Sequence, residues 1–270
     1  MCGRYTLTST DGLAGRFGLE GFAETRIPPR IEPHIVAGGA PRFVPRFNVA
    51  PSQGVPVIVG QHVKQPDGTW AEDGSFAPML TAMRWGFQPA WMKSDGQRPP
   101  PINARSESLL ERPMFRNSVA RGRCLIPADG FYEWKVVPGR KTKQPIYIRL
   151  KGGPLFAFAG LHVQGRDDVG ETCVIVTMAA NDVLSPIHER MPVVLDREAE
   201  QMWLDPSLDD PRAALSYLRP EPPEAFEVYP VSSRVSSARN EGPNLIERDE
   251  PDAAQADDTQ DDEPRALRLF

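Results

Sequence analysis

The chain has 270 residues, which is enough for one large domain or two small ones. Its formal net charge of −5 is concentrated at one end, because residues 241–270 carry ten acidic and three basic side chains. The first 240 residues are therefore close to neutral, which excludes the broad basic surface of a non-specific nucleic-acid binder. Any anion site must be a local group of arginines.

The cysteines and the apolar runs exclude several protein classes. Cys2, Cys124 and Cys173 are odd in number and have no Cys-x-x-Cys spacing, so neither a disulfide framework nor a structural zinc site is expected. Arg4 interrupts the start of the chain where a signal peptide needs apolar residues, and no apolar run approaches the ~20 residues that span a bilayer. We expect a cytoplasmic monomer that needs no metal or organic cofactor and no membrane.

Short strands and turns dominate the first half of the chain. We expect strands at residues 2–8, 55–59 and 83–87, a loop over 25–46, and a helix over 114–120. The run Ser9-Thr10-Asp11 predicts the cap of a short helix that ends near Gly18. Two turn signals, Asp67-Gly68 and Asp73-Gly74, predict a hairpin within residues 60–80.

Strands also dominate the second half. We expect them at residues 123–126, 131–135, 146–150, 156–161, 173–178, 191–195 and 228–231, with a helical turn at 183–187 and helices at 198–204 and 211–218. Many short strands and few helices predict an α+β fold, an antiparallel barrel-like β core flanked by helices. One domain should cover residues 1–248, and residues 249–270, with eight acidic side chains, should form a disordered tail.

The start of the chain offers unusual chemistry. Once Met1 is removed, Cys2 carries a free α-amine and a thiol on adjacent carbons. The α-amine has a pKa of about 7.7–8.0, so roughly a tenth of it is neutral at pH 7. Such an aminothiol captures aldehydes: the amine forms a Schiff base, and the thiol closes onto it to give a thiazolidine. The alternative is that Cys2 is an ordinary second residue.

Six short blocks, in order along the chain, favour the chemical interpretation of Cys2. They are Met1-Cys2-Gly3-Arg4, Phe47-Asn48-Val49-Ala50-Pro51, Arg84-Trp85-Gly86, Ile102-Asn103-Ala104-Arg105-Ser106-Glu107, Ala128-Asp129-Gly130-Phe131-Tyr132-Glu133-Trp134 and Ile187-His188-Glu189-Arg190-Met191-Pro192. Together they closely resemble the SOS-response-associated peptidase (SRAP) family of abasic-site processing proteins, over residues 2–247. The resemblance implies an SRAP-type fold and capture of abasic sites in single-stranded DNA as a crosslink through Cys2.

Four residues are candidates for the chemistry. Cys2 is the nucleophile, and Glu133, among aromatic residues that would raise its pKa, is the candidate for acid–base work. His188 titrates near neutral pH and is the second proton carrier. The resemblance implies that Asn103 holds the sugar or the thiazolidine. For Glu133 the alternative is an exposed strand residue, and for Asn103 it is a structural turn.

Two kinds of side chain are candidates for binding DNA. The arginines are Arg4, Arg105 and Arg190, supported by Arg84, whose forked guanidinium groups suit phosphates. The aromatics are Trp85, Phe87 and Trp91, which would stack on bases beside the missing one. Core packing is the alternative for the aromatics, and for Trp85 the two interpretations have equal weight.

Three functions remain open at this point. The first is the abasic-site crosslink, on single-stranded DNA and also at replication-fork DNA. Weak lyase activity would follow from β-elimination of the imine, and self-removal of the residues before Cys2 would account for a peptidase. The second function is an N-terminal-nucleophile cysteine peptidase or hydrolase using Cys2. The third is a DNA-binding module without catalysis.

Overall fold

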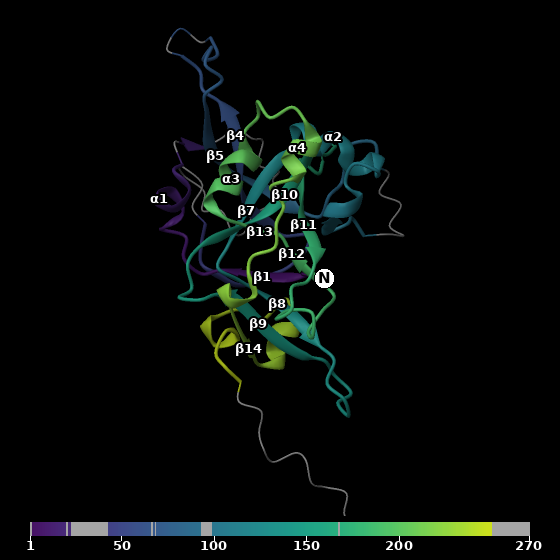
Figure 1. Cartoon of the computed structure of the whole chain (residues 1–270). Coiled ribbons are helices and arrows are strands. Elements are labelled where there is room, and N and C mark those ends of the chain that lie inside the picture. The colour runs from purple at the N-terminus through teal and green to yellow at the C-terminus, as the bar shows by residue number, and fades with distance from the viewer. Residues whose placement is uncertain are drawn as a thin grey trace, which may run out of the picture.

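The computed structural model describes residues 2–19, 21–22, 43–65, 67, 69–92, 99–166 and 168–249. Two β-sheets make up most of this part of the chain, and short helices lie beside them (Figure 1). The expected α+β class is confirmed. Most of the expected loop at 25–46, and the expected disordered tail from residue 250 onward, lie outside the described residues. Within the described ranges, no helix is long and apolar enough to cross a membrane.

The first sheet has five strands in the order β14-β9-β8-β1-β3, and all its neighbours are antiparallel. The strands are β1 (Arg4–Leu7), β3 (Arg46–Val49), β8 (Gly130–Lys135), β9 (Gln144–Leu150) and β14 (Phe226–Pro230). Strand β1 crosses the middle of the molecule, with β8, β9 and β14 on one side of it and the main strands of the second sheet on the other (Figure 1). The start of the chain is therefore at the junction of the two sheets.

The second sheet closes on itself as a ring. Its main strands are β4 (Gly54–His62), β5 (Phe76–Trp85), β7 (Arg123–Ala128), β10 (Phe156–Gln164) and β11 (Glu171–Ala179). The order along the sheet is β11-β10-β7-β4-β5, and a parallel pairing of Thr172 with Arg84 and Cys173 with Trp85 joins β11 back to β5. The barrel-like core expected from the sequence corresponds to this ring, in which the closing pair is parallel.

Smaller elements complete the ring and cover it. The short strands are β2 (Gly21–Phe22), β6 (Asn103–Arg105), β12 (Arg190–Pro192) and β13 (Val194–Leu195). The α-helices are α1 (Leu13–Phe17), α2 (Pro113–Arg121), α3 (Arg197–Leu204) and α4 (Pro211–Leu215), and the 3-10 helices are η1 (Ser106–Ser108), η2 (Pro223–Ala225), η3 (Ser233–Ser236) and η4 (Pro243–Leu245). The hairpin expected around residues 60–80 is confirmed as β4 and β5, paired from Gly54–Arg84 to His62–Phe76.

Aromatic rings fix the first sheet onto the second. Phe158 of β10 makes edge-to-face contacts with Tyr5 of β1 and with Phe131 of β8, each with ring centroids 5.9 Å apart. All three rings are fully buried. Such pairs contribute about 0.5–1.5 kcal/mol each beyond the burial of their area. The position of β1, and of Cys2 just before it, is therefore set by the core.

A buried carboxylate holds the other end of β1. Asp129 accepts hydrogen bonds from the Thr6 hydroxyl and from both the backbone N–H and the hydroxyl of Thr8. The next residue, Gly130, leaves no room for a side chain, because a Cβ there would lie 2.1 Å from the Tyr147 hydroxyl oxygen. The Asp129-Gly130 pair of the fifth block is thus structural and anchors the strand that leads to Cys2.

The same carboxylate explains why the expected helix cap is wrong. Asp129 also accepts from the backbone N–H of Ser9, at 3.2 Å, so the chain is held in non-helical form at this point. Helix α1 starts only at Leu13, after Gly12, and has no side-chain cap. Its end at Gly18, in the left-handed conformation, is as expected.

Three other expected elements have different limits. The strand at 83–87 ends at Trp85, because Gly86 has φ of 138°, which L-residues rarely adopt. The strand at 191–195 is two short strands separated by Val193, whose N–H bonds to Val176 and whose carbonyl accepts from Ala159. The helix expected at 211–218 ends at Leu215.

The C-terminal part of the described chain is pinned beside β1 and β3. The buried Asn48 amide donates to the carbonyl oxygens of Val235, Ser237 and Asn240, at 2.9–3.2 Å. An unpaired buried amide costs about 1–3 kcal/mol, so these bonds fix the segment firmly. The Asn48 of the second block is therefore a packing residue that brings residues 235–240 close to the start of the chain.

Candidate active site

The structure brings together three of the four residues proposed for chemistry, at the start of β1. The Asn103 amide nitrogen donates to the Cys2 carbonyl oxygen at 2.8 Å, across 101 residues of sequence. The pairing of β1 with β8 matches Arg4 with Tyr132, so Glu133 follows directly along β8 beside the residues that precede Arg4. The negative charge of Glu133 acts on the Cys2 thiol, since it is among the causes that raise the pKa of that thiol.

The Cys2 thiol is buried and protonated. Its side chain is fully enclosed, and burial raises its pKa far above the ordinary value, with Glu133 adding to the effect and the chain's amino terminus opposing it. The thiol donates to the carbonyl oxygen of Arg4 at 3.7 Å. Reactive thiolates have lowered pKa values and cationic or basic neighbours. The thiol of Cys2 is therefore not poised as a resting thiolate.

Glu133 is a buried carboxyl with a shifted pKa. It is 4% exposed, and burial raises its pKa, against the attraction of the chain's amino terminus and of Lys143. The alternative of a solvent-facing strand residue is wrong, because the aromatic neighbours in the block belong to the core. A carboxyl whose pKa moves toward neutrality can both donate and accept protons at physiological pH.

His188 follows a helical turn at residues 181–187, which is where such a turn was expected. Its Nδ1 accepts the backbone N–H of Arg190 at 3.0 Å, so the neutral ring carries its proton on Nε2. Burial lowers the pKa of His188, and the amino terminus also lowers it. The ring is half-buried and neutral near pH 7. Lys143 acts electrostatically on both Glu133 and His188, so the two proton carriers lie in the same region of the protein.

Arg190, the neighbour of His188, is already engaged. Its Nη1 and Nη2 donate to the two oxygens of Glu107 at 2.7 and 2.9 Å, and Nη2 also donates to the Thr177 carbonyl at 2.7 Å. The Arg190 side chain is 11% exposed, whereas that of Glu107 is 55% exposed. The carboxylate therefore covers the guanidinium on its solvent side and occupies the fork that a phosphate would use.

The other three arginines differ in their surroundings. Arg4 is half-buried, donates weakly to Ser236 at 3.4 Å, and has its pKa lowered by burial. Arg84 is half-buried at the end of β5, next to the strand that closes the ring. Arg105 is exposed at the end of β6, two residues after Asn103. Arg105 is thus the arginine most open to a ligand.

The aromatic residues divide into core and surface. Trp85 is fully buried, donates its indole N–H to the Ile102 carbonyl at 2.9 Å and packs edge-on against Tyr5. Phe87 is fully buried against Phe115. Core packing is therefore the correct interpretation for both, and neither ring can stack on a base. Trp91 is 67% exposed and presents its ring to solvent.

Three candidate residues carry buried polar atoms without a hydrogen-bond partner. These atoms are Arg4 Nε, Asn103 Oδ1 and Arg190 Nε, and other such atoms among the described residues lie on Tyr5, Asn48, His162 and Glu171. Each such atom costs free energy. Asn103 Oδ1, next to the amide nitrogen that bonds to Cys2, is available to a polar ligand at this site.

Comparison with known proteins identifies the family of this chain. The family model described as "SOS response associated peptidase (SRAP)" matches residues 1–238. The chain belongs to the SRAP family. It is 40% identical over 251 residues to the abasic site processing protein YoqW of Bacillus subtilis, covering 92% of this chain and 99% of that one. It is 33% identical to the abasic site processing protein YedK of Escherichia coli, with 92% and 99% covered.

An animal protein and two solved structures are also similar to this chain. The abasic site processing protein HMCES of Gallus gallus is 31% identical over 230 residues, covering 76% of this chain and 66% of that one. A solved structure of a phage-related protein from Bordetella bronchiseptica is 29% identical with a TM-score of 0.55, over 85% of this chain and 94% of that one. A protein from Bacteroides thetaiotaomicron, 24% identical with a TM-score of 0.65 over 92% of this SRAP chain and all of that one, shares the fold.

Two residues at the site were not singled out from the sequence. Glu107 lies in the fourth block, but its pairing with Arg190 joins positions 83 apart and has no local signal. Lys143 acts electrostatically on both Glu133 and His188. The sequence feature that could have pointed to Lys143 is the basic run from Lys135 to Lys143, which contains no acidic residue.

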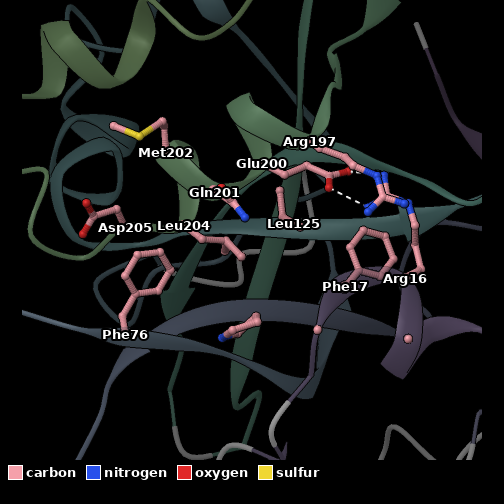
Figure 2. Close-up of a pocket in the computed structure, with 13 residues that line it drawn as sticks. Arg16, Phe17, Phe76, Leu125, Arg197, Glu200, Gln201, Met202, Leu204 and Asp205 are labelled. Carbon is pink, nitrogen blue, oxygen red and sulfur yellow. Dashed lines mark hydrogen bonds and ion pairs between the residues drawn. The ribbon is translucent and has the colours of Figure 1, made fainter.

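A separate cavity lies away from these residues. It has a volume of about 610 Å³ and is enclosed by α1, α3 and neighbouring strands, with Phe17, Phe76 and Leu125 in its wall (Figure 2). Arg16 and Glu200 form a two-pronged ion pair at its edge, with both contacts at 2.8 Å. None of the candidate site residues lines it. Within the described parts of the chain, no group of three or more potential metal ligands was found.

Proposed function

We propose that this SRAP protein processes abasic sites in single-stranded DNA by forming a covalent thiazolidine through Cys2, in DNA repair. The single observation that carries the proposal is the arrangement around Cys2. Asn103 fixes the Cys2 carbonyl at 2.8 Å, and the buried carboxyl of Glu133 lies close enough to raise the pKa of its thiol. The names of the relatives, abasic site processing proteins, point to the same substrate.

The proposed reaction balances as an aldehyde condensation. Glu133 assists opening of the deoxyribose ring to the C1′ aldehyde, and the neutral α-amine of Cys2 attacks C1′ to form a carbinolamine. Proton transfer from Glu133 releases the oxygen as water and leaves an imine. The thiol sulfur then bonds to C1′, and the thiol proton moves to the nitrogen. His188, neutral and with a proton on Nε2, shuttles protons in both directions.

The contacts of the site support distinct positioning roles. Asn103 Oδ1, unpaired and buried, is available to accept a hydrogen bond from a sugar hydroxyl. Arg105, exposed beside it, and Arg4 supply cations for the flanking phosphates, and Trp91 supplies an exposed ring for stacking. The imine also permits β-elimination, which would give weak lyase activity.

The cysteine hydrolase is less well supported. Such an enzyme attacks through a thiolate generated by an adjacent base. The thiol of Cys2 is held protonated by burial, and its hydrogen bond goes to the Arg4 carbonyl. An amine-first reaction needs no resting thiolate, so the same surroundings are compatible with crosslinking. We restrict the peptidase activity to removal of residues that precede Cys2.

Mass spectrometry tests the proposal directly. Purified protein should lack Met1, and incubation with abasic single-stranded DNA should give a denaturation-resistant adduct whose mass is the sum of the two minus one water. A retained methionine would turn the Cys2 nitrogen into an unreactive amide. Crosslinking by protein that still carries Met1, or no adduct from processed protein, would refute the mechanism.

The Glu107–Arg190 pair gives a second test, on DNA affinity. Replacing Glu107 with Gln removes the carboxylate that competes with phosphate for Arg190, so binding of single-stranded DNA should tighten, by roughly 3- to 10-fold at low salt. Arg190 is 11% exposed but keeps its bond to the Thr177 carbonyl, and glutamine can still accept a hydrogen bond from it, so the melting temperature should fall only modestly. Fluorescence anisotropy measures the affinity. Weaker binding by a folded Glu107→Gln protein would show instead that Glu107 holds Arg190 in its binding position.

A further inference from the structure

The β8–β9 hairpin carries a basic surface beside the candidate active site. Lys135 is the last residue of β8, and the loop that follows contains Arg140, Lys141 and Lys143. No acidic residue occurs from residue 134 to residue 166. In a chain of net charge −5, such a run stands out. The hairpin projects from the lower sheet, away from the body of the protein (Figure 1).

The hairpin presents these charges to solvent. Arg140, Lys141 and Lys143 are exposed, and so is the apolar Val136, at 68%. A turn at Pro138-Gly139 closes the hairpin, with the Arg140 N–H bonded to the Val137 carbonyl at 3.1 Å and Gly139 at φ 79°. The backbone of the loop is thus defined, and Arg140 also donates to the Gln144 side chain at 2.8 Å.

The hairpin is continuous with the site. Lys135 lies on the same strand as Glu133, two residues later, so the two side chains share a face and lie about 7 Å apart along the strand. Lys143 acts electrostatically on both Glu133 and His188. The tip of the loop is four to five residues beyond Lys135, about 13–17 Å further along. A strand of DNA leaving Cys2 along β8 would therefore run beside these cations.

We propose that the β8–β9 hairpin is a second DNA-binding element that holds the phosphates of the nucleotides flanking the abasic site on one side. This inference rests on the proposed function and extends it. Lysine and arginine on an exposed loop bind phosphates without reading sequence, which suits a lesion that occurs in any context. Val136 supplies an apolar contact to the sugars or bases of the same strand.

The test uses a double variant and a matched control. The variant Arg140→Ala, Lys141→Ala removes two exposed charges from the tip of the hairpin and keeps Lys143, which acts on Glu133 and His188. The control Lys151→Ala, Arg219→Ala removes two exposed charges elsewhere, and Lys151 lies just beyond the opposite end of β9. Both changes alter the total charge equally, so the long-range field of the protein is controlled.

The probes are three abasic single-stranded oligonucleotides: a minimal one, one extended by about ten nucleotides on the 5′ side only, and one extended equally on the 3′ side. We expect one extended probe to bind wild-type protein at least 10-fold more tightly than the minimal probe. The hairpin variant should lose this gain, and the control should keep it. Between about 50 and about 200 mM salt, wild type should lose about 7-fold more affinity than the hairpin variant, the effect of two phosphate contacts.

The outcomes separate this inference from the proposed function. Crosslinking of the minimal probe by both variants at the wild-type rate is expected, because no hairpin residue forms a bond to C1′. Failure of wild type to crosslink that probe would refute the proposed function and leave the hairpin measurement intact. The inference is overturned if neither extension strengthens binding, if the gain survives in the hairpin variant, or if the control loses it equally. If the hairpin variant keeps the tighter binding of the extended probe, the hairpin does not bind DNA, and an acidic protein surface becomes its candidate partner.

Discussion

Replacing Cys2 with serine should turn a durable adduct into a hydrolysable one. Serine keeps the α-amine, so the Schiff base with the abasic aldehyde still forms. A hydroxyl in place of the thiol closes to an oxazolidine, which reopens far more readily than a thiazolidine. We expect adducts of Cys2→Ser protein to survive denaturation only after borohydride reduction, whereas wild-type adducts survive without it. Gel mobility of the two adducts, with and without reductant, measures the difference.

Two controls make that result specific. Cys2→Ala should behave like Cys2→Ser, because it also keeps the amine and lacks the thiol. Cys124→Ala changes a fully buried cysteine of the ring, away from Cys2, and should crosslink like wild type. Equally durable adducts from Cys2→Ser and wild-type protein would show that ring closure by sulfur is not the trapping step.

The local elements of this fold could be predicted because each one has its own pattern. The apolar runs at Arg123, Phe156 and Cys173 became β7, β10 and β11, with limits within a few residues of those expected. The three-residue strand β6 has no such pattern. It exists only because Asn103, Ala104 and Arg105 pair with β11 in parallel. Closure of the ring by β5 and β11 is equally non-local and could not be predicted from the sequence.

The candidate site shows the same division. Cys2, Asn103, Glu133 and His188 were singled out by chemistry and by the family blocks, and the structure brings Cys2, Asn103 and Glu133 together at the start of β1. Burial was harder to predict, because a tryptophan at a strand end suits both the core and a DNA surface. Trp85 proved to be core, and Trp91 proved to be exposed. The Glu107–Arg190 pair joins η1 to β12, two elements distant in sequence that only the fold brings together.

The stability of the site also follows from its chemistry. Burial raises the pKa of Glu133, so ionising that carboxyl in the folded state costs free energy. The pKa of this carboxyl is higher in the folded protein than in the unfolded chain. By linkage, the free energy of unfolding therefore falls as the pH rises from the lower of these two values through the higher one. Buried Glu133 therefore lowers the free energy of unfolding at neutral pH, as expected of a residue that serves function and not stability.

Glu133→Gln should consequently slow crosslinking without weakening the fold. Glutamine keeps the size and much of the hydrogen bonding of glutamate, but it transfers no proton at neutral pH. We expect the single-turnover rate to fall by roughly 10²–10⁴-fold, the usual contribution of general acid–base catalysis. The melting temperature should equal or exceed that of wild type, because the buried ionisable group is gone. Both quantities should be measured on one preparation.

Glu171→Gln is the matched control. Glu171 is a partly buried carboxyl whose pKa is also raised by burial, but it lies on β11 beside His162 of β10 and not beside Cys2. Glu171 has no role in the proposed reaction, so its replacement should leave the crosslinking rate unchanged. Binding of undamaged single-stranded DNA should be nearly the same for wild type and Glu133→Gln, since the change affects the chemical step. A folded Glu133→Gln protein that crosslinks at the wild-type rate would exclude Glu133 from the mechanism and make His188 the principal proton carrier.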